Sequence, residues 1–447
     1  MLGGKALRHA GGASFNELFE RKLAKVAVIG LGYVGLAMSV EMAIAGYEVH
    51  GIDIDEDKIK QLQSGHSYIA GIEDDSIRSI IGGSFFVGSD YCVIAEMDVV
   101  IICVPTPLTK EREPDITYIQ SAVNNCAPFL RDGTLVILES TTYPGTTDKF
   151  VTNVIEEKKQ WKAGNQFYAC YSPERVDPGN TRYTIANCPK IVGGTTPACL
   201  EAGMAFYASF IESVIPVSQP SVAETAKLFE NTFRSVNIAL VNELLLLCEM
   251  MNVNVWEVLE AAATKPFGYM PFVPGPGIGG HCIPIDPLYL HWKAKSYGHS
   301  FKMIELADES NRRMPAHVIE RITDLLNARS KAINGSRITF IGAAYKKNVN
   351  DLRESPALEI MARLLDKQAN VRYHDPFIPN LRLGNKQLES IPLKPESLEE
   401  DDLVIITTDH TGVDYDMIVN NAPLVFDTRN IIKRDERSHV FVLGDGR

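Results

Sequence analysis

Val26-Ala-Val-Ile-Gly30-Leu-Gly32-Tyr-Val-Gly35 is a stretch that indicates how the first half of this 447-residue chain folds. Its first four residues are apolar, which predicts a buried strand. The glycines have the Gly-x-Gly-x-x-Gly spacing, and a helical pattern continues from Leu36 to Ala45. A strand, turn and helix of this kind bring the backbone close to a pyrophosphate and pack the helix tightly on the strand. A glycine turn without a ligand is the alternative.

A carboxylate follows the next predicted strand. The run at residues 48–52 ends at Asp53, which can accept hydrogen bonds from the hydroxyl groups of an adenosine ribose. Its charge would repel a 2′-phosphate, so the sequence predicts NAD rather than NADP as the cofactor. Tyr33 and Val34 are further candidate NAD contacts, as is Lys58, for which a surface position on a helix is the alternative.

The rest of the first half repeats the alternation of short apolar runs with helical patterns. Most of the runs are apolar without alternation, so they predict a parallel sheet that is covered on both faces. They lie at residues 26–29, 48–52, 99–102, 135–138 and 167–170. This βαβ pattern is typical of a doubly wound α/β fold.

The second half begins with a different pattern. From Ser221 to about Ala263, one long helical pattern without a breaker predicts a structural spine, which is also a candidate dimerisation element. A loop rich in glycine and proline (263–287) and a second helical stretch (302–329) follow. Strand runs then return at residues 337–342, 371–374, 403–407 and 424–426. We therefore expect an α/β domain, a helical connector and a smaller α/β domain.

Composition and charge exclude several classes of protein. The chain has 44 basic and 56 acidic residues, a net charge of −12, and no long basic run, which argues against nucleic acid or an anionic membrane as partner. No stretch of about 18 apolar residues is present, so no membrane span is expected. The eight cysteines form no Cys-x-x-Cys pair, so neither a metal site nor a disulfide framework is predicted. A reducing, cytoplasmic location fits this pattern best. Residues 1–23 are interpreted as a flexible or amphipathic leader.

One cysteine lies in an unusual loop, Pro274-Gly-Pro-Gly-Ile-Gly-Gly-His-Cys282-Ile-Pro-Ile-Asp286. Glycines there let the backbone approach a ligand, because no Cβ stands in the way. A cysteine in such a loop is a candidate covalent nucleophile. For an arbitrary cysteine, buried packing is the commoner role.

Several segments in the right order give the chain a family resemblance. Beyond about residue 24 it resembles the UDP-glucose/GDP-mannose dehydrogenase family. The segments are Gly30–Gly35, Val104-Pro-Thr-Pro107, Ser140-Thr141, Ser172-Pro-Glu174, Lys227-x-x-x-Asn231, Gly279-Gly-His-Cys282, Asp286 and Tyr345-Lys-Lys…Arg353-Glu-Ser.

The resemblance implies a fold and a reaction. The fold is α/β, with two Rossmann-like doubly wound domains joined by a long central helix. The expected parts are a leader (1–23), an NAD-binding domain (24–219), a central helical domain with the cysteine loop (220–330) and a UDP-sugar-binding domain (331–447). The implied reaction oxidises the C6 alcohol of a sugar nucleotide to a carboxylate with two NAD⁺, in a homodimer or a higher oligomer.

The cysteine loop also narrows the substrate. UDP-glucose dehydrogenases usually have Gly-Gly-Ser-Cys-x-x-Lys-Asp, whereas this chain has His281 and Ile285 in place of the serine and the lysine. With Ser172-Pro-Glu-Arg-Val-Asp-Pro-Gly179, this form is similar to the UDP-N-acetylhexosamine 6-dehydrogenases, in particular those acting on UDP-N-acetylglucosamine. UDP-N-acetylmannosamine, UDP-N-acetylgalactosamine and UDP-glucose are the alternatives.

The family pattern implies a role for each catalytic candidate. Cys282 would add to the aldehyde at C6, and Lys227 with Asn231, four residues apart on one helix face, would stabilise the oxyanion. Glu174 would be the general base for the hydrolytic water, with a helix-capping acid as the alternative. Thr141 would hold a water, or simply cap a helix. Asp286 would position water or tune Lys227, or serve as a turn residue.

The remaining candidates are ligand contacts. Val104, Pro105, Thr106, Thr141 and Arg353 are assigned to NAD. The substrate candidates are Glu174, Arg175, Val176, Lys227, Asn231, Phe272, Gly277, Gly279, Lys346 and Arg429. Arginine suits phosphate because its planar fork bonds two oxygens; a surface arginine is the alternative for Arg429.

Two other classes of function compete with this interpretation. A two-electron hydroxyacid dehydrogenase with a similar first domain would leave Cys282 without a task and would release one NADH per substrate. An NAD-binding scaffold without turnover would release none. The set of candidate catalytic residues argues against the scaffold.

Overall fold

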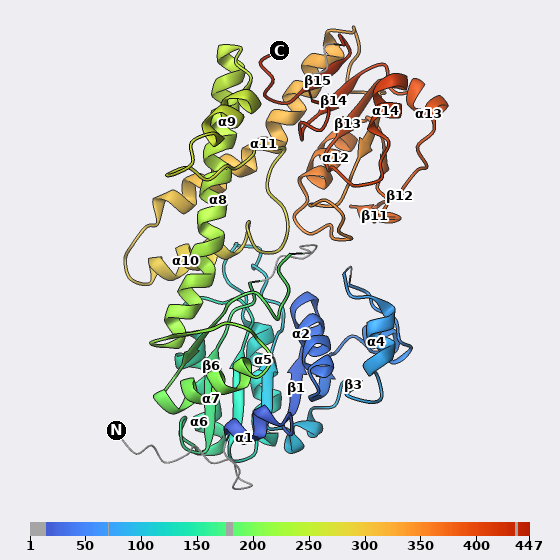
Figure 1. Ribbon diagram of the computed structural model, residues 1–447. Coiled ribbons are helices and arrows are strands. Elements are labelled where there is room, and N and C mark those ends of the chain that lie inside the picture. Colours follow the sequence, from blue (N-terminus) through green and yellow to red (C-terminus); the bar gives the residue numbers. More distant parts are fainter. Residues whose placement is uncertain (1–14, 70, 176–181, 434–436) are drawn as a thin grey trace. The chain divides into compact units, whose positions relative to one another are not determined.

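The computed structural model describes residues 15–69, 71–175, 182–433 and 437–447 (Figure 1). The chain divides into two compact units. Unit 1 comprises Met1–Glu230 and Leu288–His299, and unit 2 comprises Asn231–Pro287 and Ser300–Arg447. Helices α8 (Pro220–Met251) and α10 (Asp286–Lys295) pass from one unit to the other.

Unit 1 is built on an eight-stranded sheet in the order β3-β2-β1-β4-β5-β6-β7-β8. All neighbouring strands are parallel except β6 and β7. The strands are β1 Lys25–Ile29, β2 Glu48–Ile52, β3 Phe85–Gly88, β4 Val99–Ile102, β5 Thr134–Leu138, β6 Phe167–Tyr171, β7 Lys190–Gly194 and β8 Val214–Val217.

Helices cover both faces of this sheet, as Figure 1 shows. Successive residues of β1 belong to different cores: Val26 and Val28 pack on one face, and Ala27 and Ile29 on the other. The covering helices are α1 Phe15–Glu20, α2 Tyr33–Ile44, α3 Glu56–Gln63, α4 Asp74–Ile80, η1 Tyr91–Glu96, α5 Thr117–Cys126, η2 Ala127–Phe129, η3 Thr147–Thr152, α6 Asn153–Lys159 and α7 Pro197–Ala208. The prediction of a sheet buried on both faces is confirmed.

Unit 2 contains a smaller, all-parallel sheet in the order β10-β9-β13-β14-β15 and a separate hairpin, β11–β12. The strands are β9 Arg337–Ile341, β10 Asn370–His374, β11 Asn380–Leu383, β12 Lys386–Glu389, β13 Leu403–Ile406, β14 Val425–Asp427 and β15 Val440–Val442. The helices that begin and end within unit 2 are α9 Val255–Ala263, α11 Lys302–Asn327, α12 Pro356–Asp366, α13 Pro395–Glu399 and α14 Tyr415–Asn421. The fold is thus α/β with two Rossmann-like sheets and a long central helix.

The prediction of one unbroken helix from Ser221 to Ala263 is wrong. Helix α8 ends at Met251 because Asn252 adopts a left-handed conformation, with φ of 55°. Asn254 then caps α9, since its side-chain oxygen accepts hydrogen bonds from the Trp256 and Glu257 amides at 2.9 and 3.3 Å. Two asparagines two residues apart were the available signal for this break.

The interpretation of residues 1–23 as a leader is also wrong for its last part. Helix α1 packs into the core of unit 1 through Phe15 and Phe19, which are 3% and 0% exposed. The ring of Phe15 lies 4.8 Å from that of Tyr168, and the ring of Phe19 lies 5.4 Å from that of Phe206. Residues 1–14 lie outside the described residues.

Candidate active site

The three glycines in the turn after β1 have different surroundings. A Cβ on Gly35 would stand 1.8 Å from the Gly30 carbonyl oxygen, and one on Gly30 (φ 91°) would stand 2.7 Å from the Cys103 carbonyl oxygen. Both glycines are therefore required by packing. A Cβ on Gly32, which caps α2, would meet no atom within 4 Å. The open space at Gly32, next to a helix N-terminus, fits a pyrophosphate.

Asp53 lies beside this turn at the end of β2 and is 8% exposed. One carboxylate oxygen accepts a hydrogen bond from the Leu31 amide at 2.8 Å, and the other accepts one from the Asp55 amide at 2.9 Å. The ammonium of Lys58 is 3.7 Å from the first oxygen. The structure thus groups Asp53 and Lys58 next to the glycine turn, and places Tyr33 and Val34 in the first turn of α2.

The loops that follow β4 and β5 are joined by hydrogen bonds. The Ser140 hydroxyl donates to the Val104 carbonyl at 2.8 Å. The phenol of Tyr289 donates to the carbonyls of Thr106 and Pro107 at 2.9 and 3.0 Å. These contacts place Val104–Thr106 and the half-buried Thr141 at the carboxyl ends of neighbouring strands, where doubly wound sheets bind ligands. The sequence reasoning missed Tyr289.

Glu224, also missed, fixes the segment after β5 to α8. Its fully buried carboxylate accepts hydrogen bonds from the Gly145 amide at 2.5 Å, the Thr147 amide at 2.9 Å and the Thr147 hydroxyl at 2.7 Å. Burial raises the pKa of Glu224 to about 7. The half-buried Lys227 follows three residues later on the same helix, so Glu224 also fixes the turn that carries this lysine.

Glu174 follows β6 and is held through both of its oxygens. One accepts a hydrogen bond from the Arg175 amide at 2.7 Å, and the other pairs with the Lys190 ammonium at 3.1 Å. The guanidinium of Arg175 pairs with Glu230 at 2.7 Å and donates to the Pro189 carbonyl at 2.9 Å. Val176, another substrate candidate, lies outside the described residues.

In unit 2, the cysteine turn is fixed to α8. The half-buried Cys282 ends the loop, and its carbonyl accepts hydrogen bonds from the Ile285 and Asp286 amides at 3.1 and 2.8 Å. The Asp286 carboxylate, 2% exposed, accepts a hydrogen bond from the Asn231 side-chain amide at 2.6 Å. The structure therefore brings together Cys282, Asp286 and Asn231, with Lys227 one turn earlier on α8.

The glycines before Cys282 are required by packing, while the expected approach of their backbone to a ligand stays a prediction. A Cβ on Gly279 would stand 2.7 Å from the Tyr345 Cβ and 2.8 Å from the Glu354 carbonyl oxygen. One on Gly280 (φ 87°) would stand 2.7 Å from the Tyr345 ring, and one on Gly277 would stand 3.1 Å from Pro356. These glycines allow the loop to lie directly on the segment that carries Lys346 and Arg353.

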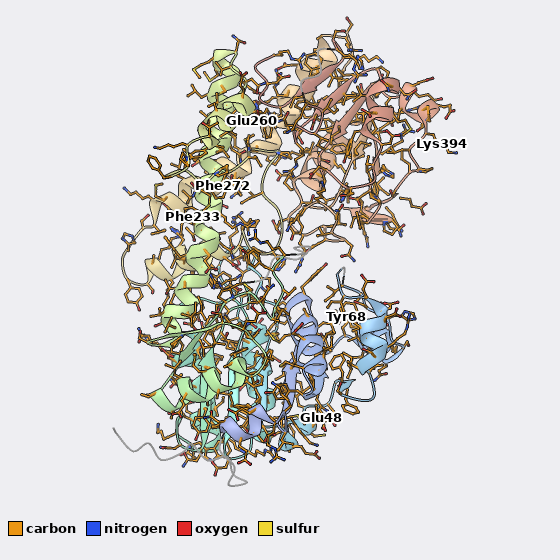
Figure 2. All side chains as sticks on the ribbon, in the orientation of Figure 1. Glu48, Tyr68, Phe233, Glu260, Phe272 and Lys394 are labelled. Carbon is orange, nitrogen blue, oxygen red and sulfur yellow. The ribbon has the colours of Figure 1, made fainter. Side chains whose placement is uncertain are left out.

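Two asparagines and two phenylalanines hold the start of the same loop. The Asn242 side-chain oxygen accepts a hydrogen bond from the Gly275 amide at 3.1 Å, and its amide group donates to Asn311 at 2.9 Å. The ring of Phe272 lies 5.8 Å from that of Phe233 at an interplanar angle of 67° (Figure 2). Asn242 and Asn311 are fully buried or nearly so, and a helical pattern alone gave no signal for them.

His281 points to Arg353. Its Nδ1 is 2.9 Å from the Arg353 guanidinium, which also pairs with Asp351 at 2.6 Å. The same ring nitrogen is 3.9 Å from the Asp351 carboxylate. The His281 ring is thus directed to the Arg353–Asp351 pair, and Arg353 is fixed to the cysteine loop.

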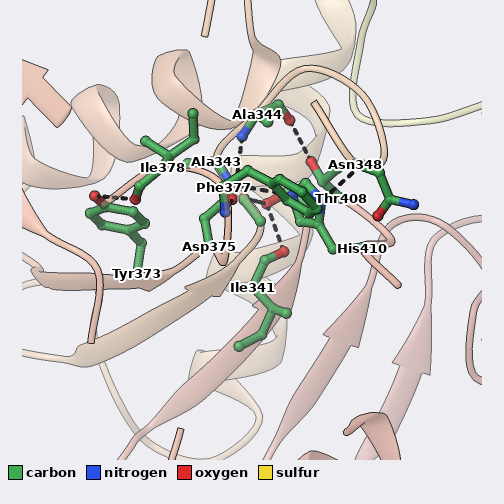
Figure 3. A network of polar contacts seen from close by, with 12 residues as sticks. Ile341, Ala343, Ala344, Asn348, Tyr373, Asp375, Phe377, Ile378, Thr408 and His410 are labelled. Atoms are coloured by element: carbon green, nitrogen blue, oxygen red, sulfur yellow. Dashed lines mark hydrogen bonds and ion pairs between the residues drawn. The ribbon is translucent and has the colours of Figure 1, made fainter. Parts of the chain in front are cut away.

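The smaller sheet has its own buried carboxylate, Asp375 (Figure 3). Asp375 follows β10 as Asp53 follows β2, but only 1% of it is exposed. It accepts hydrogen bonds from the Ala343 and Ala344 amides at 2.7 and 2.9 Å and from His410 Nε2 at 3.0 Å. These internal partners occupy the carboxylate, so it does not offer a ribose contact of the kind expected at Asp53.

Arg429 and Lys346 follow strands of the same sheet. The Arg429 Nε donates to the Thr407 carbonyl at 2.7 Å, and a Cβ on Gly275 would stand 2.8 Å from its Nη1. Arg429 therefore lies against the start of the cysteine loop. Lys346 is half-buried in the segment after β9.

Three models of one protein family match successive parts of the chain. Residues 24–211 match the model of the UDP-glucose/GDP-mannose dehydrogenase family NAD binding domain, residues 221–313 its central domain, and residues 339–434 its UDP binding domain. The match to the first of these domains confirms NAD as the predicted cofactor.

Named relatives match over nearly their whole length. The chain is 34% identical over 440 residues to a UDP-N-acetyl-D-mannosamine dehydrogenase of Methanocaldococcus jannaschii, covering 95% of this chain and 97% of that protein. It is 34% identical over 403 residues to the protein of that name from Escherichia coli K12, covering 87% and 94%.

Solved structures agree with these relatives. A UDP-D-ManNAc dehydrogenase from Pyrococcus horikoshii superposes with a TM-score of 0.85 at 33% identity, over 94% of this chain and 99% of that one. Within the part of the chain that the structure describes, no helix is long and apolar enough to cross a membrane. The chain belongs to the UDP-glucose/GDP-mannose dehydrogenase family, as an NAD-dependent UDP-sugar dehydrogenase of its UDP-N-acetylhexosamine subgroup.

Proposed function

We propose that this enzyme oxidises the C6 alcohol of a UDP-N-acetylhexosamine to the carboxylate, with two NAD⁺ per turnover and Cys282 as the covalent nucleophile. The observation that carries the proposal is the fixed turn of Cys282, which is bonded through Asp286 to Asn231. An ordinary two-electron dehydrogenase has no use for a cysteine held in this way.

The reaction proceeds in four steps. Gly30–Gly35 and Asp53 would hold NAD⁺, which would take up the hydride that leaves C6 in the first and third steps, while the hydroxyl at C6 loses its proton. In the second step the Cys282 thiolate adds to the aldehyde and gives a thiohemiacetal, whose oxidation leaves a thioester. In the fourth step Glu174 takes a proton from the water that adds to the thioester, and the sulfur leaves as thiolate.

The other candidates support these steps. Lys227 and Asn231 stabilise the oxygen at C6 when it carries negative charge. Asp286 orients Asn231, because it accepts the hydrogen bond of that amide. Thr141 holds the hydrolytic water near the carboxyl end of β5.

The proposed ligand contacts fall into two groups, one for NAD and one for the UDP-sugar. Gly30–Gly35, Asp53, Lys58, Val104–Thr106 and Arg353 hold NAD. The UDP-sugar is held by Arg175, Phe272, Lys346, Arg429 and the backbone at Gly277 and Gly279. We propose domain bounds of 24–219, 220–330 and 331–447, which the three matched family segments support.

We propose UDP-N-acetylmannosamine as the substrate because the relatives are named for it. This replaces the sequence-based preference for UDP-N-acetylglucosamine. UDP-N-acetylglucosamine remains the second candidate, since the Ser172-Pro-Glu-Arg form favours it. NADH release from these two sugars, UDP-N-acetylgalactosamine and UDP-glucose would decide: we expect the highest kcat/KM with UDP-N-acetylmannosamine. A preference for UDP-glucose would contradict the N-acetylhexosamine assignment.

We also propose that the enzyme is a cytoplasmic homodimer or higher homo-oligomer. Its eight cysteines are thiols, as in a reducing compartment. Helix α8 exposes apolar side chains at steps of four and seven residues, which gives one stripe along the helix. The stripe consists of Val222, Phe229, Phe233, Leu240, Leu247 and Met251, of which Leu240 is 65% exposed.

The stripe predicts the effect of a charge at Leu240. Leu240→Glu is expected to shift the protein to a smaller species in light scattering coupled to size exclusion, because a carboxylate would be buried in the interface. Leu23→Glu, at another exposed leucine, is the matched control. A wild-type protein that is monomeric at micromolar concentration would contradict the proposal.

Asp53 is expected to set the choice of cofactor. Asp53→Ala should weaken NAD binding by about 10-fold or more, because it removes a charged hydrogen-bond acceptor, and should reduce the preference for NAD over NADP. Fluorescence titration with both cofactors measures this, with exposed Asp57→Ala as the control. Unchanged selectivity would remove Asp53 from the ribose contact.

A further inference from the structure

Three charged side chains of unit 1 are in contact at the carboxyl ends of the sheet. The Lys190 ammonium, at the start of β7, is 3.1 Å from a carboxylate oxygen of Glu139 and 3.1 Å from one of Glu174. Glu139 directly follows β5, and Glu174 follows β6. Lys190 and Glu139 are 3% and 2% exposed. The reaction scheme uses only Glu174 of the three.

The two carboxylates of this cluster keep Lys190 charged, although it is buried. Burial alone would lower the pKa of Lys190, but the carboxylates of Glu139 and Glu174 outweigh it and raise that pKa above its ordinary value. Lys190 is therefore a permanent cation. Burial raises the pKa of Glu139, against the attraction of Lys190. Glu139 also accepts a hydrogen bond from the Tyr207 phenol, which further fixes its orientation.

The other titratable groups that face the cluster carry no competing charge. Burial raises the pKa of the Cys103 and Cys188 thiols and of the Tyr207 phenol, so these groups are neutral. The guanidinium of Arg175 pairs with Glu230. Lys190 is thus the cation that contacts the Glu174 carboxylate.

We propose that Lys190 and Glu139 are positioning residues for the general base: Lys190 holds the Glu174 carboxylate in place, and Glu139 anchors Lys190. This proposal rests on the proposed role of Glu174. When water adds to the thioester carbon, one proton of the water passes to Glu174, the carbon–sulfur bond breaks, and its electron pair remains on Cys282. A carboxylate without its cation would be misplaced and protonated at higher pH.

Glu139 is too deeply buried to touch a substrate, and a single buried carboxylate would suffice to neutralise Lys190. The second carboxylate, Glu174, is more exposed than the other two and belongs to a strand-end loop. The lysine therefore connects a buried anchor to a group at the ligand-binding edge of the sheet. Residues that do not touch a ligand commonly orient those that do in this way.

The test uses Lys190→Met, the conservative Lys190→Arg, and the double variant Glu139→Gln/Lys190→Met. The double variant removes both buried charges and stays informative if the single variant does not fold. Three quantities are measured with a UDP-N-acetylhexosamine: NADH in the first turnover, the steady-state rate against pH, and the intact mass of the protein.

For Lys190→Met and the double variant we expect first-turnover NADH release close to wild type, a steady-state rate lower by about 100-fold, and a thioester adduct on Cys282. The acidic limb of the pH profile should move to higher pH, and Lys190→Arg should restore most of the rate. Folded variants with the wild-type rate and pH profile would overturn the inference, as would equal loss of both hydride transfers without an adduct. Failure of the wild type to release two NADH per sugar would instead overturn the proposed function, and this inference with it.

Discussion

Cys282→Ser is expected to abolish formation of the uronic acid while NAD binding remains close to wild type. The serine hydroxyl is somewhat smaller than the thiol and has the same connectivity, but it is far less ionised at neutral pH and is a weaker nucleophile. Covalent capture of the aldehyde therefore fails, and the second hydride transfer has no thiohemiacetal to act on. A loss of about 1,000-fold or more in carboxylate formation is expected, as for removal of other enzymatic nucleophiles.

The structure supports a local effect of this substitution. The turn that presents Cys282 is held by its own carbonyl, which accepts the Asp286 amide at 2.8 Å, and by the Asn231–Asp286 hydrogen bond. None of these contacts uses the sulfur. Product analysis by mass spectrometry measures the effect, and Cys92→Ser, at an exposed cysteine, is the control. Full carboxylate formation by Cys282→Ser would disprove the covalent scheme.

Glu174→Gln is expected to stop the reaction at the thioester. The amide is nearly the same size as the carboxylate but cannot take a proton from water, so hydrolysis should slow by about 100- to 10,000-fold. Both hydride transfers precede this step, so two NADH should still be released in the first turnover. The result should be a burst of NADH followed by a slow phase, with a sugar-nucleotide adduct on Cys282.

Intact mass after a single turnover identifies this adduct. Glu212→Gln, an exposed carboxylate in the same unit, serves as the matched control and should give neither burst nor adduct. If Glu174→Gln slows the first hydride transfer and carries no adduct, Glu174 acts in the first oxidation rather than in hydrolysis.

The elements of the fold were largely predictable because each depends on local sequence. Apolar runs predicted nine strands within one or two residues, since a strand buried on both faces requires such a run. Apart from β7, the strands that were missed, such as β8 with Pro216 and the exposed Ile215, are short and lie at the edges of sheets or in the separate hairpin. Strand β7 lies inside the larger sheet, but its five residues include Lys190 and two glycines, which weaken the strand signal. Helix α1 was missed because its two buried phenylalanines lie in a stretch next to a Gly/Ala-rich segment.

The candidate site was only partly predictable. Residue types at motif positions made Cys282, Lys227 and Glu174 candidates, but their partners come from distant positions in the chain. Lys190 contacts Glu139 across 51 positions (190 − 139), and Glu224 binds Thr147 across 77. No periodicity links such residues, so Glu139, Lys190, Glu224 and Tyr289 emerged only from the structure. Likewise, a glycine is needed at position 279 because Tyr345, from a distant part of the chain, leaves no room for a Cβ there.

The number of NADH molecules released per UDP-N-acetylhexosamine consumed tests the central claim most directly. With limiting UDP-N-acetylmannosamine and excess NAD⁺, the absorbance of NADH and the amount of uronic acid are measured at completion. The covalent scheme through Cys282 predicts two NADH and one uronic acid per sugar. One NADH per sugar, with the aldehyde as product, or no NADH with any UDP-N-acetylhexosamine, would contradict it.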